Sequence, residues 1–211
     1  MTTTNNQSSL LYQLRTLVPE RRLLRSEALR LAELQANRLL ELTGTNEPGT
    51  PDVLITGLPY VQVLLRRDLP DGASGMTDWL KPRWVVLLNR TEPAVRRRFS
   101  LWHEFKHILD HEGVDQLYDG WNQRDIEGVA DYFAACALMP KKLVKRLYGQ
   151  GHQDASDLAA LFGVSEVAMR YRLQQTGLVD RYARCAGMAT NVSLPKGARR
   201  YFRTGQLTLA A

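Results

Sequence analysis

Two histidines four residues apart, with a glutamate directly after the first, constrain this 211-residue chain more than any other feature. They lie in the run His103-Glu104-Phe105-Lys106-His107, an HExxH pattern. In a helix, positions i and i+4 share one face, so both imidazoles can bind the same zinc ion. The pattern therefore requires a helix here. It also predicts that Glu104 acts as a general base toward a water molecule at the metal.

One zinc ion needs a third protein ligand from elsewhere in the chain. Downstream, Glu127 is followed one helical turn later by Asp131. This Glu-x-x-x-Asp spacing resembles the gluzincin arrangement, which implies that Glu127 is the third ligand and that Asp131 orients the first histidine. Taken alone, Glu127 also fits an ordinary acidic residue on a helix surface, and the two histidines also fit a solvated helix.

The other candidates for the third ligand fail on spacing. The metzincin pattern needs a histidine at position 113, where this chain has a glycine. His111 lies about 12 Å from His103 along a helix that rises ~1.5 Å per residue, too far for one ion to bridge. His111 is therefore expected to interact with the dipole at the helix C-terminus or to pack against neighbours.

Hydrophobic periodicity predicts a mixed fold with helices and a few strands. Asp71-Gly72 and Gly75 indicate a turn or loop between the strands, and Thr91-Glu92-Pro93 marks a helix start. The predicted helices cover residues 10–43, 93–111, 122–139 and 141–148, and the predicted strands cover residues 52–66 and 83–89.

A separate helical unit is predicted over residues 154–178. It reads as a helix, a turn at Gly163 and a second helix capped by Ser165, an order that resembles a helix-turn-helix. The outer face of the second helix is expected to carry Arg170, Arg172 and Gln174. Three roles stay open: a packing module, a protein-binding unit and a DNA reader. Few side chains here can read base edges, which makes DNA reading the least supported role.

Charge is unevenly distributed along the chain. After Asp180 the sequence has six basic residues and no acidic one, and this tail accounts for the whole formal net charge of +6. Such a tail favours nucleic acid or an acidic partner, or is simply solvated. Residues 1–9 are polar and are expected to be disordered. We therefore divide the chain into residues 1–9, a metallopeptidase domain over 10–148, a helix-turn-helix-like unit over 149–180 and a basic tail over 181–211.

Cysteine usage and hydropathy bear on the compartment. Cys136 and Cys185 form neither a CxxC pair nor a disulfide framework, which is typical of a reducing environment. The N-terminus lacks the basic and apolar regions of a secretory signal, and no apolar run is long enough to span a bilayer. The expected localisation is cytoplasmic, with no membrane partner.

Residues 98–109 read RFSLWHEFKHIL, and the next helix reads EGVADYFAA over residues 127–135, with Leu-Met-Pro over 138–140. These segments resemble the ImmA/IrrE family of metallopeptidases, whose pattern is an RxxLxHExxH helix followed by E-x-x-A-[ND]-x-F-A-A-x-L-[LM]-x-P. The resemblance covers roughly residues 50–178. It departs from the usual family residues at Trp102 and Lys106, which bears on substrate preference rather than on the metal.

The resemblance implies an α+β, zincin-like metallopeptidase domain with a small twisted sheet, followed by a helical domain. It implies that His103, His107 and Glu127 bind Zn²⁺, with Glu104 as base. Family members are proteases that cleave or inactivate a repressor in phages, mobile elements or stress responses. The strand ending at Asn89 is expected to be the sheet edge along which a peptide lies, with Asn89 as a substrate contact.

Two rival functions remain at this stage. One is a DNA-binding regulator with a vestigial metal site, and the other is a metal-dependent, antitoxin-like interaction protein that does not cut its partner. No residue is assigned as the oxyanion donor; by residue type alone the candidates are Tyr132, Tyr148 and His152.

Overall fold

The computed structural model describes residues 10–179, so the expectations for residues 1–9 and for the basic tail lie outside the described part of the chain. A short helix at residues 10–15 comes first. The later helices are α2 (Arg25–Thr43), α3 (Val53–Thr56), α4 (Ala94–Asp110), α5 (Val114–Leu117), α6 (Gln123–Leu138), α7 (Lys141–Gly149), α8 (Ala155–Phe162) and α9 (Glu166–Thr176). The strands are β1 (Val61–Arg66), β2 (Gly75–Leu80) and β3 (Arg83–Asn89). The predicted α+β class is confirmed.

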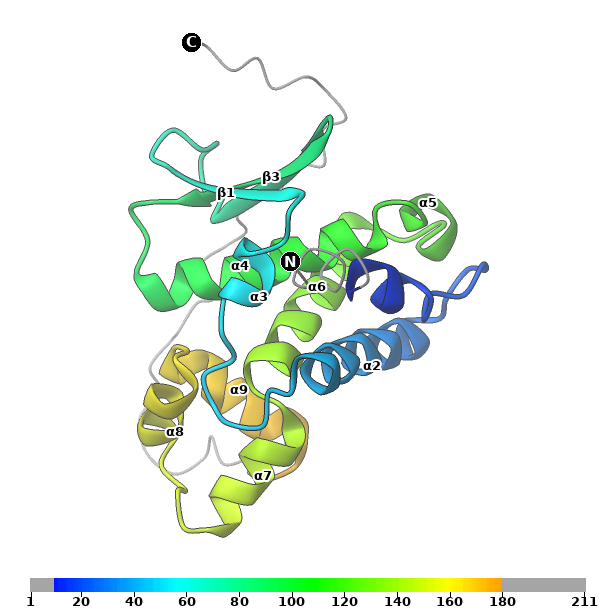
Figure 1. Cartoon of the computed structure of the whole chain (residues 1–211). Helices are drawn as coiled ribbons and strands as arrows, with labels where there is room; N and C mark the ends of the chain where they lie inside the picture. Colours follow the sequence, from blue (N-terminus) through cyan, green and yellow to red (C-terminus); the bar gives the residue numbers. More distant parts are fainter. Residues whose placement is uncertain (1–9, 180–211) are drawn as a thin grey trace.

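The three strands form one small sheet in the order β1-β3-β2, which lies at the top of Figure 1 with the helices below it. β1 pairs with β3 in parallel, and β2 pairs with β3 in antiparallel orientation. The prediction that residues 84–89 form an edge strand is therefore wrong, because β3 is the central strand. Its continuous apolar run explains the position: Val85 and Val86 point to opposite faces and are both buried, as is typical of an interior strand.

Two further strand predictions need correction. The strand expected from residue 52 begins only at Val61, because residues 53–56 form the single turn α3. The loop expected around Gly75 contains β2, which starts at Gly75 itself. The turn at Asp71-Gly72 is present, with Gly72 at a φ of 78°. β2 could not be predicted from alternating apolar residues, because it contains polar residues and directly follows a turn.

Helix α4 lies in the middle of the molecule, between the sheet and α6 (Figure 1). Every residue from Ser100 to Asp110 is buried. Trp102, Phe105 and Ile108 are fully buried, and the Phe105 ring lies 6.2 Å from the ring of Phe133 on α6. Burial of each large apolar side chain contributes roughly 1.5–3 kcal/mol. The HExxH helix is thus held on both sides, which fixes the orientation of its side chains.

Lys106, the x residue before the second histidine, is also buried, with 1% of its surface exposed. Its ammonium donates to Asp110 Oδ1 at 2.6 Å and to Gln35 Oε1 on α2 at 2.8 Å. Asp110 Oδ2 also accepts from the Tyr118 hydroxyl at 2.6 Å. Burial lowers the pKa of Lys106, while Asp110 opposes this effect. Lys106 therefore connects α4 to α2 inside the protein. Its influence on substrate preference stays a prediction.

The helix-turn-helix-like unit is present as α8 and α9, with Gly163 at a φ of 64° in the turn and the Ser165 side chain accepting from the Ala168 amide. Arg172 was expected on the outer face of α9, but it is 2% exposed and donates to the Met139 carbonyl at 2.8 Å. The side of a helix that faces the core depends on its neighbours, and here α9 packs toward the end of α6. Arg170 is exposed and pairs with Glu166.

Arg98, the first residue of the RxxLxHExxH pattern, joins this unit to the HExxH helix. Its guanidinium donates to the Phe162 carbonyl at 2.7 Å and to the Gly163 carbonyl at 2.9 Å. It also donates to Asp52 Oδ1 at 3.0 Å. Together with Arg172, it fixes α8 and α9 to the body of the protein. The domain division at residue 149 stays a prediction.

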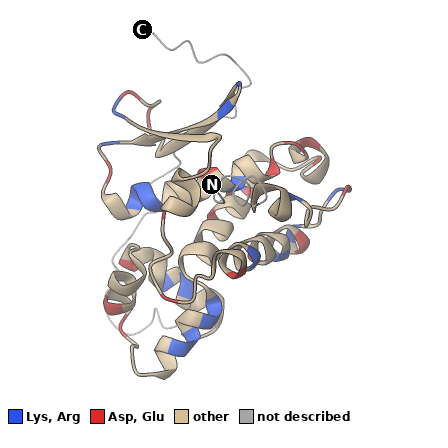
Figure 2. Ribbon diagram, viewed as in Figure 1, with Lys and Arg blue, Asp and Glu red and all other residues tan. Residues whose placement is uncertain are grey.

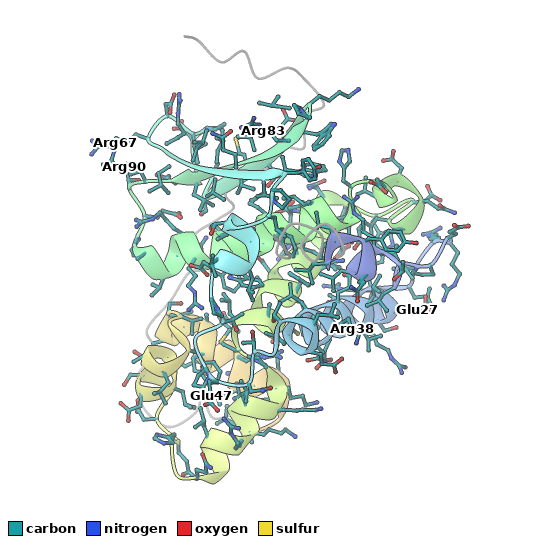
Figure 3. The ribbon with its side chains drawn as sticks, in the orientation of Figure 1. Glu27, Arg38, Glu47, Arg67, Arg83 and Arg90 are labelled. Carbon is teal, nitrogen blue, oxygen red and sulfur yellow. The ribbon has the colours of Figure 1, made fainter. Side chains whose placement is uncertain are left out.

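Surface charge differs between regions of the molecule. Figure 2 shows basic residues gathered on α7, at the bottom of the view. Figure 3 shows Arg67 and Arg90 at one end of the sheet and Arg83 at the other, all pointing away from the helices.

None of the helices in residues 10–179 combines the length and the apolar character needed to cross a bilayer.

Candidate metal centre

Helix α4 places the two histidines one turn apart on the same face. The Nε2 atoms of His103 and His107 are 3.0 Å apart, and the rings meet edge to face with centroids 4.9 Å apart. Both side chains are buried, with 1% and 8% of their surface exposed. His111 lies elsewhere: its ring packs edge-on against Trp84, with centroids 4.7 Å apart, which agrees with the expected packing role.

Helix α6 brings Glu127 to the same point. Glu127 Oε2 lies 3.0 Å from His103 Nε2, and Oε1 lies 3.6 Å from His107 Nε2. The start of α6 is set by Asn122, whose side chain accepts from the Asp125 amide at 3.0 Å. This cap places Glu127 in the second helical turn, facing α4.

Asp131 lies one turn further along α6, and its Oδ1 is 2.7 Å from His103 Nδ1. A carboxylate accepts hydrogen bonds, so the Nδ1 atom carries the proton and the Nε2 atom presents its lone pair. That lone pair is directed toward Glu127 and His107. This is the orientation that an outer carboxylate imposes on a metal-binding histidine.

The three groups fit a divalent cation. One ligand atom from each of His103, His107 and Glu127 lies within 4.8 Å of the others. Around a tetrahedral zinc ion with bonds of about 2.0–2.1 Å, ligand atoms are separated by about 3.3 Å. His103 Nε2 lies 3.0 Å from both His107 Nε2 and Glu127 Oε2, and His107 Nε2 lies 3.6 Å from the other Glu127 oxygen, Oε1; these distances are close to that value. With the proton on Nδ1, His103 Nε2 is an acceptor, and a cation among these three groups would balance its lone pair and the negative charge of Glu127.

Electrostatics keep Glu127 ionised. Burial raises the pKa of Glu127, but the imidazoles of His103 and His107, in their protonated forms, outweigh burial and hold this pKa at about 2. The Gln123 side-chain amide also donates to Glu127 Oε1, at 2.7 Å. Glu127 is therefore a carboxylate at neutral pH, which is the form that binds a metal.

Glu104 is 3% exposed and points toward β2. Thr77 Oγ1 on β2 donates to Glu104 Oε2 at 2.9 Å. A Cβ atom on Gly75 would lie only 3.0 Å from Glu104 Oε1. Sequence reasoning missed Thr77, Gly75 and Gln123. No sequence signal indicated Thr77, because β2 was not predicted as a strand, whereas the i, i+4 spacing from Glu127 could have indicated Gln123.

Other candidates lie in different surroundings. The Asn89 side chain donates to the Ala73 carbonyl at 3.2 Å and accepts from Thr91, so it stabilises the turn after β3. Its role as a substrate contact stays a prediction. The Tyr132 hydroxyl donates to Glu33 on α2 at 3.3 Å. The pKa of Tyr132 is raised to about 12, and burial is the largest cause.

A hollow of about 520 Å³ lies between the starts of α2 and α6, lined in part by Leu24, Trp121 and Asp125. Asp125 is two residues from Glu127, so the two side chains leave α6 on nearly opposite faces. The hollow is therefore separate from the metal centre.

Residues 61–174, just over half of the chain, match the sequence model of the peptidase family M78, described as the IrrE N-terminal-like domain. The chain belongs to this family. The resemblance inferred from the HExxH helix and the following helix is thereby confirmed. The matched residues of this M78 chain include both helices of the candidate metal centre, all three strands and most of the helix-turn-helix-like unit.

Among solved structures, the M78 chain is similar to a Mycobacterium tuberculosis transcriptional regulator, with 18% sequence identity and a TM-score of 0.56. The alignment covers 78% of this chain and 51% of the regulator, so the chain spans about half the length of that protein. At this identity the likeness shows a shared fold. A search of curated proteins gives no match.

Proposed function

We propose that this M78 protein is a zinc-dependent endopeptidase that cleaves a regulatory protein, namely a transcriptional repressor of a phage, a mobile element or a stress response. One observation carries the proposal: His103, His107 and Glu127 converge on one point while Glu104 follows the first histidine on the same helix. Two histidines and one glutamate are the ligands of a catalytic zinc site, which keeps one position open for water or substrate.

Each residue has a distinct task in this proposal. His103, His107 and Glu127 hold the ion, and Asp131 keeps the first histidine in the tautomer that binds metal. A bound zinc ion supplies Lewis-acid chemistry. Glu104 accepts a proton from the attacking water and passes it to the nitrogen of the departing amine, so that the scissile C–N bond breaks as a C–O bond forms.

The substrate is proposed to be an extended polypeptide segment that pairs with β2. This strand is at the edge of the sheet, and within residues 10–179 only β3 pairs with it. Exposed strand edges present backbone donors and acceptors to an added strand. Thr77 of the same strand contacts Glu104, so a peptide along β2 would lie close to the general base. β2 thus takes the role that the sequence had suggested for β3.

A repressor as substrate is supported by the family and by the transcriptional regulator that shares the fold. A protein acting on a repressor is expected in the cytoplasm. The DNA-binding rival is weakened because Arg172 is buried and Arg170 is paired with Glu166. The interaction rival needs the same metal ligands, so only a cutting assay separates it from the peptidase.

The test is to co-express the chain with the repressor encoded beside it and to measure the intact masses of all products. The wild-type protein should generate defined new termini. Glu104→Gln should retain zinc and produce none, because glutamine cannot accept the proton; loss of a general base costs on the order of 10²–10⁴ in rate. Cleavage by Glu104→Gln at a near wild-type rate would exclude this mechanism. Binding of the repressor by both proteins without cleavage would favour the interaction rival.

A further inference from the structure

We propose that Thr77 is a positioning residue for Glu104, and that Gly75 leaves the space that makes this contact possible. The effect on catalysis rests on the proposed peptidase function. The contact itself can be tested without any substrate.

The hydrogen bond joins two elements that are far apart in sequence. Thr77 Oγ1 donates to Glu104 Oε2 at 2.9 Å, from the edge strand to the HExxH helix. Side chains alternate along a strand, so Gly75 and Thr77 lie on the same face of β2. Their partners in β3 are Leu88 and Val86, which are 4% and 0% exposed. Thr77 is therefore on the covered face of the sheet, directed at α4.

Gly75 explains how β2 comes close enough. A Cβ atom at this position would lie 3.0 Å from Glu104 Oε1, 3.1 Å from Glu104 Cγ and 3.3 Å from Leu88 Cδ2. Contacts of 3.0–3.3 Å are tighter than nearly all real Cβ contacts, so an added Cβ would require Glu104 or Leu88 to shift by a few tenths of an ångström. A glycine at residue 75 therefore allows the backbone of β2 to lie against the Glu104 carboxylate.

These two contacts limit the positions open to Glu104. A glutamate side chain has three rotatable bonds and loses considerable entropy when it is held in one rotamer. Thr77 binds one carboxylate oxygen, and the backbone at Gly75 lies beside the other. Proton transfer requires a heavy-atom distance of about 2.6–3.2 Å, so a base held in place before substrate arrives reacts faster than a mobile one.

The first test measures the hydrogen bond by a double-mutant cycle in the full-length chain. Thr77→Val keeps the shape of the side chain and removes the donor, and Glu104→Met removes the acceptor. Hydrogen bonds to charged groups contribute about 1.5–3 kcal/mol, so the two changes should be coupled by roughly tenfold or more in the unfolding equilibrium constant. Additive effects, with a coupling factor below about two, would refute the contact.

The second test measures repressor cleavage by Thr77→Val and Thr77→Ser, with Thr56→Val as a control because Thr56 is exposed on α3. Thr77→Val should keep full zinc content and an unchanged KM, while kcat falls on the order of 10–100-fold, as for other outer partners of catalytic groups. Serine keeps the donor and should restore kcat to within about threefold of wild type. A purely structural role would not give this selective rescue.

The outcomes of the two tests are distinguishable. If the wild-type protein cleaves no repressor but Thr77→Val and Glu104→Met are coupled in the double-mutant cycle, the proposed function is rejected and the Thr77–Glu104 contact is retained. If cleavage depends on Glu104 but kcat is unchanged in Thr77→Val, the proposed function is retained and the positioning role of Thr77 is rejected. Gly75→Ala provides a further check, since it should lower kcat while the hydroxyl donor is still present.

Discussion

Replacement of Lys106 by methionine tests the description of the protein interior around the HExxH helix. The Lys106 ammonium is buried and hydrogen-bonds to Asp110 and Gln35. Methionine has a similar length, so little volume changes, but Asp110 loses its cationic partner and keeps only the Tyr118 hydroxyl. Removal of one partner from a buried ion pair costs about 3–5 kcal/mol. In a domain of this size, 1 kcal/mol corresponds to roughly 2–4 °C in Tm, so Tm should fall by about 6–20 °C.

The assay is urea unfolding and thermal melting of the full chain, with Lys141→Met as a matched control on the exposed surface of α7. The control should change stability by less than about 0.5 kcal/mol. The double variant Lys106→Met/Asp110→Leu should recover much of the loss, because neither charge of this ion pair then remains buried. A loss below about 1 kcal/mol in Lys106→Met would show that this network does not stabilise the fold as described.

The remaining predictions concern the metal, the helix-turn-helix-like unit and bound ligand. Asp131→Ala should weaken zinc affinity by roughly 10–100-fold in a competition titration against a chelator; an unchanged affinity would remove Asp131 from the metal centre. Fluorescence anisotropy at physiological salt should detect only weak DNA binding that fades as salt rises and that diminishes when residues 181–211 are deleted. Nanomolar, sequence-specific binding that survives the deletion would contradict the expectation that the helix-turn-helix-like unit does not read DNA. Chelation of zinc should lower Tm, since a ligand that binds the folded state stabilises it; an unchanged Tm would contradict binding at this site.

The helices of the metal centre could be predicted because their determinants are local. The spacing of the two histidines in HExxH predicts a helix, and Asn122 is a recognisable cap for α6. The continuous apolar run of β3 predicts a buried strand. The place of Asp131 beside His103 also follows from its i, i+4 spacing from Glu127 along α6. The same spacing applies to Gln123, which sequence reasoning missed.

The rest depends on packing between distant segments. Thr77 and Glu104 are 27 residues apart, and nothing in either local sequence indicates that they meet. β2 carries polar residues and follows a turn, so its apolar alternation is weak. Arg172 was placed on the wrong face of α9, because the buried face is determined by α6 and the Met139 carbonyl rather than by the composition of α9.

The most direct test of the metal centre is the zinc content of the purified chain, measured by elemental analysis for the wild type, Glu104→Gln and Glu127→Ala. The geometry of His103, His107 and Glu127 predicts one zinc ion per chain in the wild type and in Glu104→Gln, and a large loss in Glu127→Ala. Full zinc occupancy in Glu127→Ala, or no zinc in the wild type, would contradict the assignment of these three residues as the metal ligands.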